Sequence, residues 1–154
     1  MRVREGMSSS VLTVGPSHKL REVARLMSER KVGAAVVMDP ESAGPGIITE
    51  RDILVSLGAG EDPDEEAVAE HLTREVVYAA PDWSLEEAAA AMVHGGFRHL
   101  IVLEQGEATG ILSVRDIVRL CVEANPTDIA APLRNGATSR EEWLKGIVAS
   151  GLKL

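Results

Sequence analysis

The chain has 154 residues, of which 45% are hydrophobic and 3% aromatic, and its formal net charge is -8. This length allows one domain or two small fused repeats. The scattered basic residues exclude the positive stripe that a nucleic-acid partner requires, and the few aromatic residues exclude stacking platforms for single strands. No apolar run approaches the ~18 residues of a membrane span, and the N-terminus lacks the apolar core of a secretory signal, so we expect a cytoplasmic protein without a membrane partner.

The sequence repeats itself once. Pro81 follows Pro16 by 65 residues, and Leu85 follows Leu20 by the same 65. After one residue is lost in a loop the shift becomes 64, which aligns Gly110 with Gly46 at the start of a repeated motif. A two-fold repeat of this length is typical of two like units packed face to face.

Both repeats predict the same elements in the same order. A short lead-in helix (3–7 and 67–72) precedes a β-rich run, and a helix with one apolar face then begins at the N-cap types Ser17 and Asp82. Two buried strands and a second helix follow, the helices ending near Gly58 and Ala124. Each repeat is therefore β-α-β-β-α, which predicts a mixed α+β fold with pseudo-two-fold symmetry. The expected strands are 10–14, 34–38 and 46–49 in the first repeat and 75–78, 100–103 and 110–113 in the second.

Four regions follow from this pattern. We expect a first repeat at 3–60, an acidic linker and lead-in helix at 61–70, a second repeat at 68–124, and a Pro/Gly connector with an amphipathic C-terminal helix at 125–154. Six acids fall between Glu61 and Glu70, and we interpret this run as a solvated linker. The apolar stripe of the C-terminal helix would be covered by its own core, by a second copy or by a partner.

Helix capping alone would explain the repeated motif. In each copy a hydroxyl residue stands at the expected N-cap, three positions before an aspartate: Thr49 precedes Asp52, and Ser113 precedes Asp116. That spacing is a capping box with Asp in place of the usual Glu. A cap is worth about 1 kcal/mol and needs no ligand.

The same motif also offers the chemistry of a nucleotide site. A strand that runs into a helix N-terminus presents backbone N–H groups to an anion, and Arg51 and Arg115 add donors suited to phosphate oxygens. The aspartate would repel an anion, but it can accept hydrogen bonds from both hydroxyls of a ribose. Gly33-Ala34 leaves room for a flat ring, whereas the second repeat has Arg98-His99 at these positions, so we expect two unequal sites.

The ordered set of features resembles a tandem cystathionine β-synthase (CBS) domain pair, or Bateman module, over about residues 3–123. The resemblance rests on the two β-α-β-β-α repeats, their Pro-x-x-x-Leu helix entries, the buried strand runs and the Gly-x-x-Thr/Ser-x-x-Asp endings. It implies a non-enzymatic, stand-alone regulatory module that binds an adenosine derivative such as AMP, ADP, ATP, S-adenosylmethionine or NAD(H) in clefts between the repeats. It also implies a homodimer, which signals through its own packing or to a partner protein. The alternative is a ligand-free structural dimerisation module whose motifs are only helix caps.

The resemblance also implies roles for the matched residues. In both repeats the aspartate would bind ribose, the hydroxyl residue and arginine would bind phosphate, and the isoleucine after the motif glycine would line the base. Each site would also take residues from the opposite repeat. One site would comprise Ile47, Thr49, Arg51 and Asp52 with Phe97, Arg98 and His99; the other would comprise Ile111, Ser113, Arg115 and Asp116 with Val32, Gly33 and Ala34.

We expect no catalytic residues, no catalytic cofactor and no metal site. The sequence shows no nucleophile with a partnered base. The four histidines lack the spacing of metal ligands, and His18 and His71 are expected at the surface near helix starts. The single Cys121 excludes an internal disulfide and a cysteine-based metal cage. These patterns do not encode which adenosine derivative binds, whether both sites fill, or how the dimer is arranged.

Overall fold

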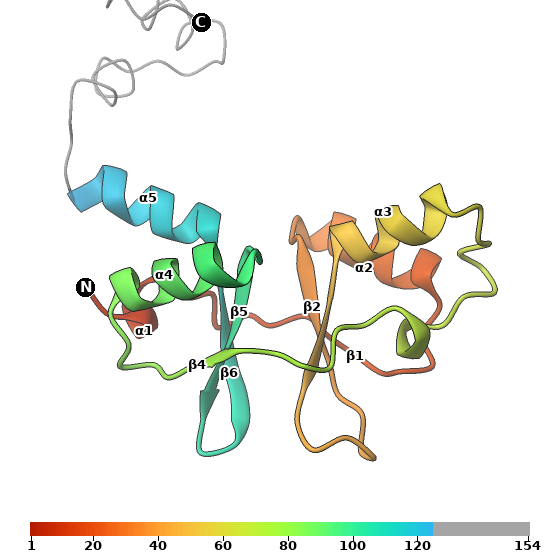
Figure 1. The fold of residues 1–154 in the computed structure, drawn as a ribbon, viewed down its shortest axis with the longest axis horizontal. Coiled ribbons are helices and arrows are strands. Elements are labelled where there is room, and N and C mark those ends of the chain that lie inside the picture. The colour runs from red at the N-terminus through yellow and green to blue at the C-terminus, as the bar shows by residue number, and fades with distance from the viewer. Residues whose placement is uncertain (125–154) are drawn as a thin grey trace, which may run out of the picture. The chain divides into compact units, whose positions relative to one another are not determined.

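The computed structural model describes residues 1–124 (Figure 1). The chain divides into two compact units, Met1–Val114 and a unit that begins at Arg115. The expected C-terminal helix within 125–154 lies outside the described residues. Within the described part of the chain, no helix is long and apolar enough to cross a membrane.

The order of elements confirms the mixed α+β fold and its β-α-β-β-α repeats. The lead-in segments form a helix in the first repeat and a single 3-10 turn in the second. The first repeat consists of α1 (Val3–Gly6), β1 (Thr13–Val14), α2 (Leu20–Arg30), β2 (Ala34–Val37), β3 (Gly46–Thr49) and α3 (Glu50–Gly58). The second consists of η1 (Val68–Glu70), β4 (Tyr78–Ala79), α4 (Leu85–Gly95), β5 (His99–Glu104), β6 (Glu107–Ser113) and α5 (Val114–Ala124).

Each repeat folds its strands into a three-stranded sheet with the same topology. The orders are β1-β2-β3 and β4-β5-β6, and in each sheet the first pair is parallel and the second antiparallel. In Figure 1 the two sheets stand side by side, with α2 and α3 on the outer side of the first and α4 on the outer side of the second. Each sheet is therefore covered on both faces, which explains why its inner strand is a continuous apolar run.

Alternation along β2 divides the core into two layers. Ala35 and Val37 pack with Ile48 against the apolar face of α2. Ala34 and Val36, on the opposite face of the strand, pack in a second cluster with Ile101 of the other sheet. Because successive side chains of a strand point to opposite faces, one short run joins its own helix to the partner repeat.

The first strand of each repeat is shorter than predicted. β1 pairs with β2 only at Thr13 and Val14, and β4 pairs with β5 only at Tyr78 and Ala79. The preceding valines of the two predicted runs, Val11 and Val76, pack against the cluster between the sheets instead of extending the ladder. Burial, rather than strand pairing, accounts for their apolar character.

Both predicted helix caps, Ser17 and Asp82, are wrong. A hydrogen-bonded backbone turn after each proline delays the helix, so Lys19 and Ser84 occupy the N-cap positions. In α4 the Ser84 side chain accepts the Glu87 N–H at 3.1 Å, and Glu87 Oε2 accepts the Ser84 N–H at 2.7 Å. These hydrogen bonds hold the pKa of Glu87 below its usual value. They form a capping box whose N-cap lies two residues later than expected.

Candidate functional site

A pocket of about 200 Å³ lies between the repeats, within the unit Met1–Val114. Three segments form its wall: the junction of β3 and α3, the turn between α4 and β5, and the segment before β4. Seven of the predicted site residues line it: Ile47, Thr49, Arg51, Asp52, Phe97, Arg98 and His99. Sequence reasoning missed the other lining residues, Thr73, Glu75, Val76, Val77 and Gly96.

The end of β3 orients Asp52. The Thr49 backbone N–H donates to Asp52 Oδ2 at 2.7 Å, and the Thr49 hydroxyl donates to the same oxygen at 3.0 Å. Thr49 is the N-cap of α3, so the predicted capping geometry is present in this repeat. Because both hydrogen bonds use Oδ2, the other carboxylate oxygen accepts no hydrogen bond from residues 1–124 and remains available for a ligand hydroxyl.

One backbone donor expected to face an anion is already used. The Glu50 N–H, at the first position of α3, donates to the Gly33 carbonyl oxygen at 3.0 Å. The second repeat repeats this contact, since the Val114 N–H donates to the Arg98 carbonyl oxygen at 3.0 Å. Each helix start is therefore tied to the residue just before its own inner strand, which leaves fewer backbone N–H groups for phosphate than the sequence indicated.

The segment before β4 reaches the pocket because it pairs with β3. Ile47 and Thr73 exchange two backbone hydrogen bonds of 3.0 and 2.9 Å. A Cβ on Gly46 would lie 2.4 Å from Leu72 Cδ1 and 3.1 Å from the Thr73 carbonyl oxygen, so the lack of a side chain at Gly46 favours this close approach. Thr73 is consequently held at the pocket wall, two residues before Glu75.

The same arrangement recurs in the second repeat. Ile111 and Ser8 exchange backbone hydrogen bonds of 3.0 and 2.9 Å, and a Cβ on Gly110 would lie 2.4 Å from Met7 Sδ. The glycine of the repeated motif is therefore explained in both copies by the close approach of a second backbone segment. The sequence displayed both glycines but gave no sign of which segment approaches them.

The turn after α4 carries the second wall. Gly96 has a left-handed backbone with φ of 68°, a conformation that favours glycine, and it ends the helix. The Phe97 N–H then donates to the Met92 carbonyl oxygen at 3.2 Å. A Cβ on Gly95 would lie 2.0 Å from Cε1 of Phe97, so the ring packs where the helix has no side chain. This turn brings Phe97 and Arg98 to the pocket.

The pocket has cationic and anionic groups at its open edge. Arg51 and Arg98 are exposed, and neither forms a salt bridge or side-chain hydrogen bond with the residues that the structure describes. Asp52 and Glu75 supply the nearby negative charge. Two guanidinium groups without an acidic partner can bind an anion without first giving up an existing ion pair.

His99 lies at the edge of the pocket nearest the first repeat. Its Nε2 atom lies 3.3 Å from the position that a Cβ on Gly33 would take, and Glu50 Oε1 lies at the same distance from that position. Gly33 therefore lets side chains from the two repeats approach one another. Its neighbours in sequence are directed elsewhere: Val32 packs on the core beneath α2, and Ala34 is buried between the sheets.

The residues predicted for the second site lie in two units. Ile111 is half-buried, and Ser113 ends β6 in the first unit. Arg115 and Asp116 lie in the first turn of α5 in the second unit, where Asp116 Oδ1 is 3.7 Å from Arg119 Nη2. The second site stays a prediction.

The described architecture matches a known family. The model of the CBS domain family matches residues 3–59 and again residues 68–123. The chain belongs to the CBS domain family. A CBS domain-containing protein of Bacillus subtilis, YhcV, is 31% identical over 115 residues, which cover 75% of this chain and 81% of the relative. A protein with CBS domains from Burkholderia ambifaria has a similar structure, with a TM-score of 0.73, 28% identity, and coverage of 80% of this chain and 95% of that chain.

Two further solved CBS structures contain ligands. A CBS domain protein from Pyrobaculum aerophilum complexed with AMP has a TM-score of 0.69 at 24% identity and covers 81% of this chain and 100% of its own. The CBS domain pair of protein MJ0100, in complex with 5′-methylthioadenosine and S-adenosyl-L-methionine, has a TM-score of 0.72 at 23% identity and covers 81% and 98%. At these identities the likeness shows the shared fold.

Proposed function

We propose that this CBS pair is a regulatory, non-enzymatic module that binds an adenosine derivative in the pocket lined by Asp52 and Arg98. The observation that carries the proposal is the convergence of complementary groups from both repeats. A carboxylate with a free oxygen, two unpaired guanidinium groups and apolar side chains line one pocket. This combination suits a ligand with a ribose, a negative charge and a flat apolar ring.

Each group of the ligand has a counterpart in the pocket. Asp52 Oδ1 accepts the ribose hydroxyls, while Thr49 acts by holding Oδ2. Arg51 and Arg98 bind the phosphates or another anionic group at the open edge. Ile47 and Phe97 line the base. The volume of about 200 Å³ is below the roughly 300–1,000 Å³ of pockets that enclose a drug-sized ligand, so the nucleoside occupies the pocket and any phosphates extend past its edge.

Solved relatives in complex with AMP and with S-adenosyl-L-methionine support this ligand class. AMP, ADP, ATP, S-adenosylmethionine and NAD(H) all carry the adenosine that the Asp52 site fits. The second site, with Ser113, Arg115 and Asp116, stays a prediction from the sequence. Since Arg98 and His99 stand where the first repeat has Gly33 and Ala34, the two sites differ in affinity or in ligand.

Isothermal titration calorimetry tests the Asp52 site. AMP, ATP and S-adenosylmethionine are titrated into wild type, Asp52→Asn and Glu86→Gln, the last of which removes an exposed carboxylate on α4. A hydrogen bond to a charged group is worth about 1.5–3 kcal/mol, so Asp52→Asn should weaken binding about ten- to a hundredfold. Glu86→Gln should bind as wild type does. Equal affinity of Asp52→Asn and Glu86→Gln would contradict the assignment.

The alternative function is a ligand-free structural dimerisation module. The cap formed by Thr49 and Asp52 favours it, because the cap accounts for both residues without a ligand. Thermal unfolding separates the two functions. A ligand at ~100 times its dissociation constant stabilises the folded state by about 2.7 kcal/mol, whereas the structural function predicts the same Tm with and without nucleotide.

We also propose that the module is a homodimer, located in the cytoplasm. Large apolar side chains are exposed on two helices: Leu54 at 69% and Val55 at 66% on α3, and Val93 at 79% on α4. A second copy would remove this apolar surface from water. Sedimentation of wild type and of Leu54→Glu measures the oligomeric state. A dimer that becomes a monomer in Leu54→Glu supports the proposal, and a wild-type monomer refutes it.

A further inference from the structure

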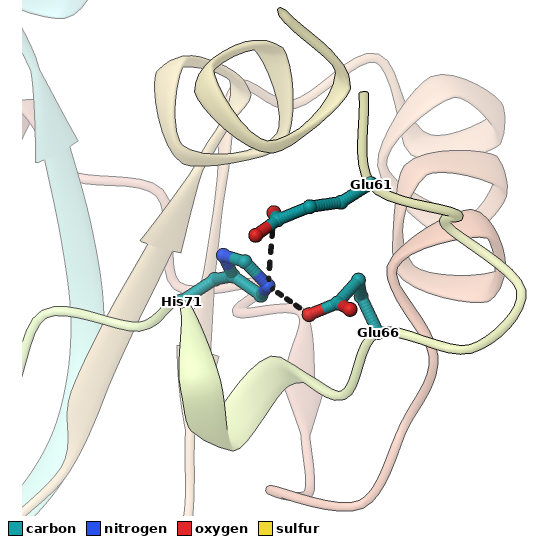
Figure 2. Close-up of side chains that lie close together, drawn as sticks. All are labelled: Glu61, Glu66 and His71. Atoms are coloured by element: carbon teal, nitrogen blue, oxygen red, sulfur yellow. Dashed lines mark hydrogen bonds and ion pairs between the residues drawn. The ribbon is translucent and has the colours of Figure 1, made fainter. Parts of the chain in front are cut away.

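Three potential metal ligands meet in the acidic segment between the repeats. Figure 2 shows the side chains of Glu61, Glu66 and His71 pointing toward one another. The His71 Nε2 atom is 2.7 Å from Glu66 Oε2 and 3.7 Å from Glu61 Oε2. All three ligand atoms lie within 4.8 Å of one another. Within the described residues, no other group of three or more His, Cys, Asp and Glu side chains comes together in this way.

The acidic run is solvated at five of its six acids, and Glu66 is the exception. The Glu66 side chain is 26% exposed and that of His71 only 15%. His71 was expected at the surface, and it instead packs inward against two acids that precede it by ten and five residues. Histidine spacing alone could not reveal the cluster, because two of its three ligands are carboxylates.

The three side chains are held by the fold rather than by one another alone. The Ser56 hydroxyl, which is 2% exposed, donates to Glu61 Oε2 at 2.6 Å, and the Glu61 N–H donates to the Ser56 carbonyl oxygen at 3.2 Å. The carbonyl oxygen of Glu66 accepts the Leu20 N–H at 3.0 Å. The His71 N–H donates to the Val68 carbonyl oxygen at 3.0 Å. The buried Ser56 thus orients one carboxylate as the outer partners of metal ligands do.

We propose that Glu61, Glu66 and His71 bind a divalent transition metal ion of the zinc type. One imidazole nitrogen and two carboxylate oxygens supply three ligands, and water completes a tetrahedral site. With bonds of about 2.0–2.1 Å, tetrahedral ligand atoms lie about 3.3 Å apart. The pair at 2.7 Å and the pair at 3.7 Å therefore each need to move by roughly half an ångström, which a change in side-chain torsions supplies.

The charges and ligand types select this class of ion. Two carboxylates carry two negative charges, which a divalent ion neutralises. Metal ligands bind in their deprotonated form, so the ion competes with protons and binding weakens at acidic pH. An imidazole ligand favours zinc and its neighbours over Mg²⁺ and Ca²⁺, which prefer oxygen ligands alone. A bound metal would join Glu61, which follows α3, to Glu66 and His71, which stand on either side of η1.

The test uses Zn²⁺ and Co²⁺ on the full chain after treatment with a chelator. We expect calorimetry to show one equivalent of Zn²⁺ bound, a higher Tm with Zn²⁺, and a Co²⁺ visible spectrum of the intensity typical of tetrahedral coordination. His71→Gln and Glu66→Gln should lose this equivalent, the rise in Tm and the spectrum. Ser56→Ala should weaken binding about ten- to a hundredfold, because it removes only the outer hydrogen bond.

His94→Gln is the matched control, since His94 is exposed on α4 and its Nδ1 atom lies 2.8 Å from the Ala90 carbonyl oxygen. It should bind Zn²⁺ as wild type does. Circular dichroism checks that each variant is folded, and Glu66→Gln remains informative if His71→Gln is not. Binding that is absent from wild type, or equal in wild type and a folded Glu66→Gln or His71→Gln, would overturn the proposal and leave a hydrogen-bonded His–Glu cluster. Binding of Mg²⁺ in preference to Zn²⁺ would overturn the choice of ion.

Discussion

Gly46→Ala should detach the segment before β4 from β3. The new Cβ would lie 2.4 Å from Leu72 Cδ1 and 3.1 Å from the Thr73 carbonyl oxygen. Overpacking of this kind costs about 1–3 kcal/mol, and each of the two hydrogen bonds between Ile47 and Thr73 contributes roughly 0.5–1.5 kcal/mol. We expect the free energy of unfolding to fall by roughly 2–6 kcal/mol in total. For a chain of this size, that loss lowers Tm by about 4–24 °C.

The assay combines urea denaturation with hydrogen exchange of the Ile47 and Thr73 amides. Gly58→Ala is the control, because Gly58 is the last residue of α3 and a Cβ there would meet no atom within 4 Å. It should be neutral or slightly stabilising, since alanine is the better helix former. Gly46→Ala should cost less stability in a Leu72→Ala background than in wild type, because Leu72→Ala removes the atom nearest to the new Cβ. Gly46→Ala that matches Gly58→Ala in stability and exchange would refute the reasoning.

Three further outcomes are expected. Ile101→Ala should cost about 2–5 kcal/mol in urea denaturation, because this fully buried side chain packs between the sheets; a loss below ~1 kcal/mol would contradict that packing. Arg51→Gln and Arg98→Gln should weaken AMP binding by calorimetry but not adenosine binding, and equal losses for both would argue against phosphate contacts. Ser84→Ala should raise the pKa of Glu87 only in part, followed by NMR titration, because it removes the Ser84 side chain but keeps the backbone N–H that is the main cause of the low pKa; an unchanged pKa would exclude a contribution from the Ser84 side chain.

The lowered pKa of Glu87 also predicts how the stability of the protein depends on pH. Its pKa in the folded state is lowered by the Ser84 hydrogen bonds. The stability that this carboxylate contributes is therefore present above the pKa of the unfolded state and is lost as the pH falls through the folded-state pKa. Ser84→Ala should flatten this part of the profile of Tm against pH. The difference between wild type and variant should then narrow at acidic pH, where Glu87 is protonated in both, and the part that remains is the loss of the hydrogen bond from the Glu87 N–H to the Ser84 hydroxyl.

Local patterns in the sequence predicted most of the fold. The repeat implied two like units, the apolar runs predicted β2 and β5, and the spacing of Thr49 and Asp52 predicted a helix cap. The strands and the cap depend on residues within a few positions of one another, so a single strand or turn determines them, and the repeat is visible by aligning the sequence with itself. The predicted caps at Ser17 and Asp82 were wrong although they too are local, because a backbone turn at each proline delays the helix start.

Seven residues of the candidate site were predicted, because the resemblance to a CBS pair implies that each site also takes residues from the opposite repeat. Spacing alone would have supplied only the stretch from Ile47 to Asp52. The wall formed by Thr73 and Glu75 was missed, because nothing local distinguishes that segment from an exposed linker. It becomes part of the pocket only by pairing with β3.

By itself, the sequence determined the two-fold repeat, the continuous apolar runs of the buried strands and the hydroxyl-to-aspartate spacing of the repeated motif. The tertiary structure decided why the motif begins with glycine, because Leu72 and Met7 approach Gly46 and Gly110 only after the repeats have folded. It also brought His71 to Glu61 and Glu66. The physical reason is that strand and cap formation are short-range, whereas close backbone approach and the meeting of side chains depend on which surfaces pack together.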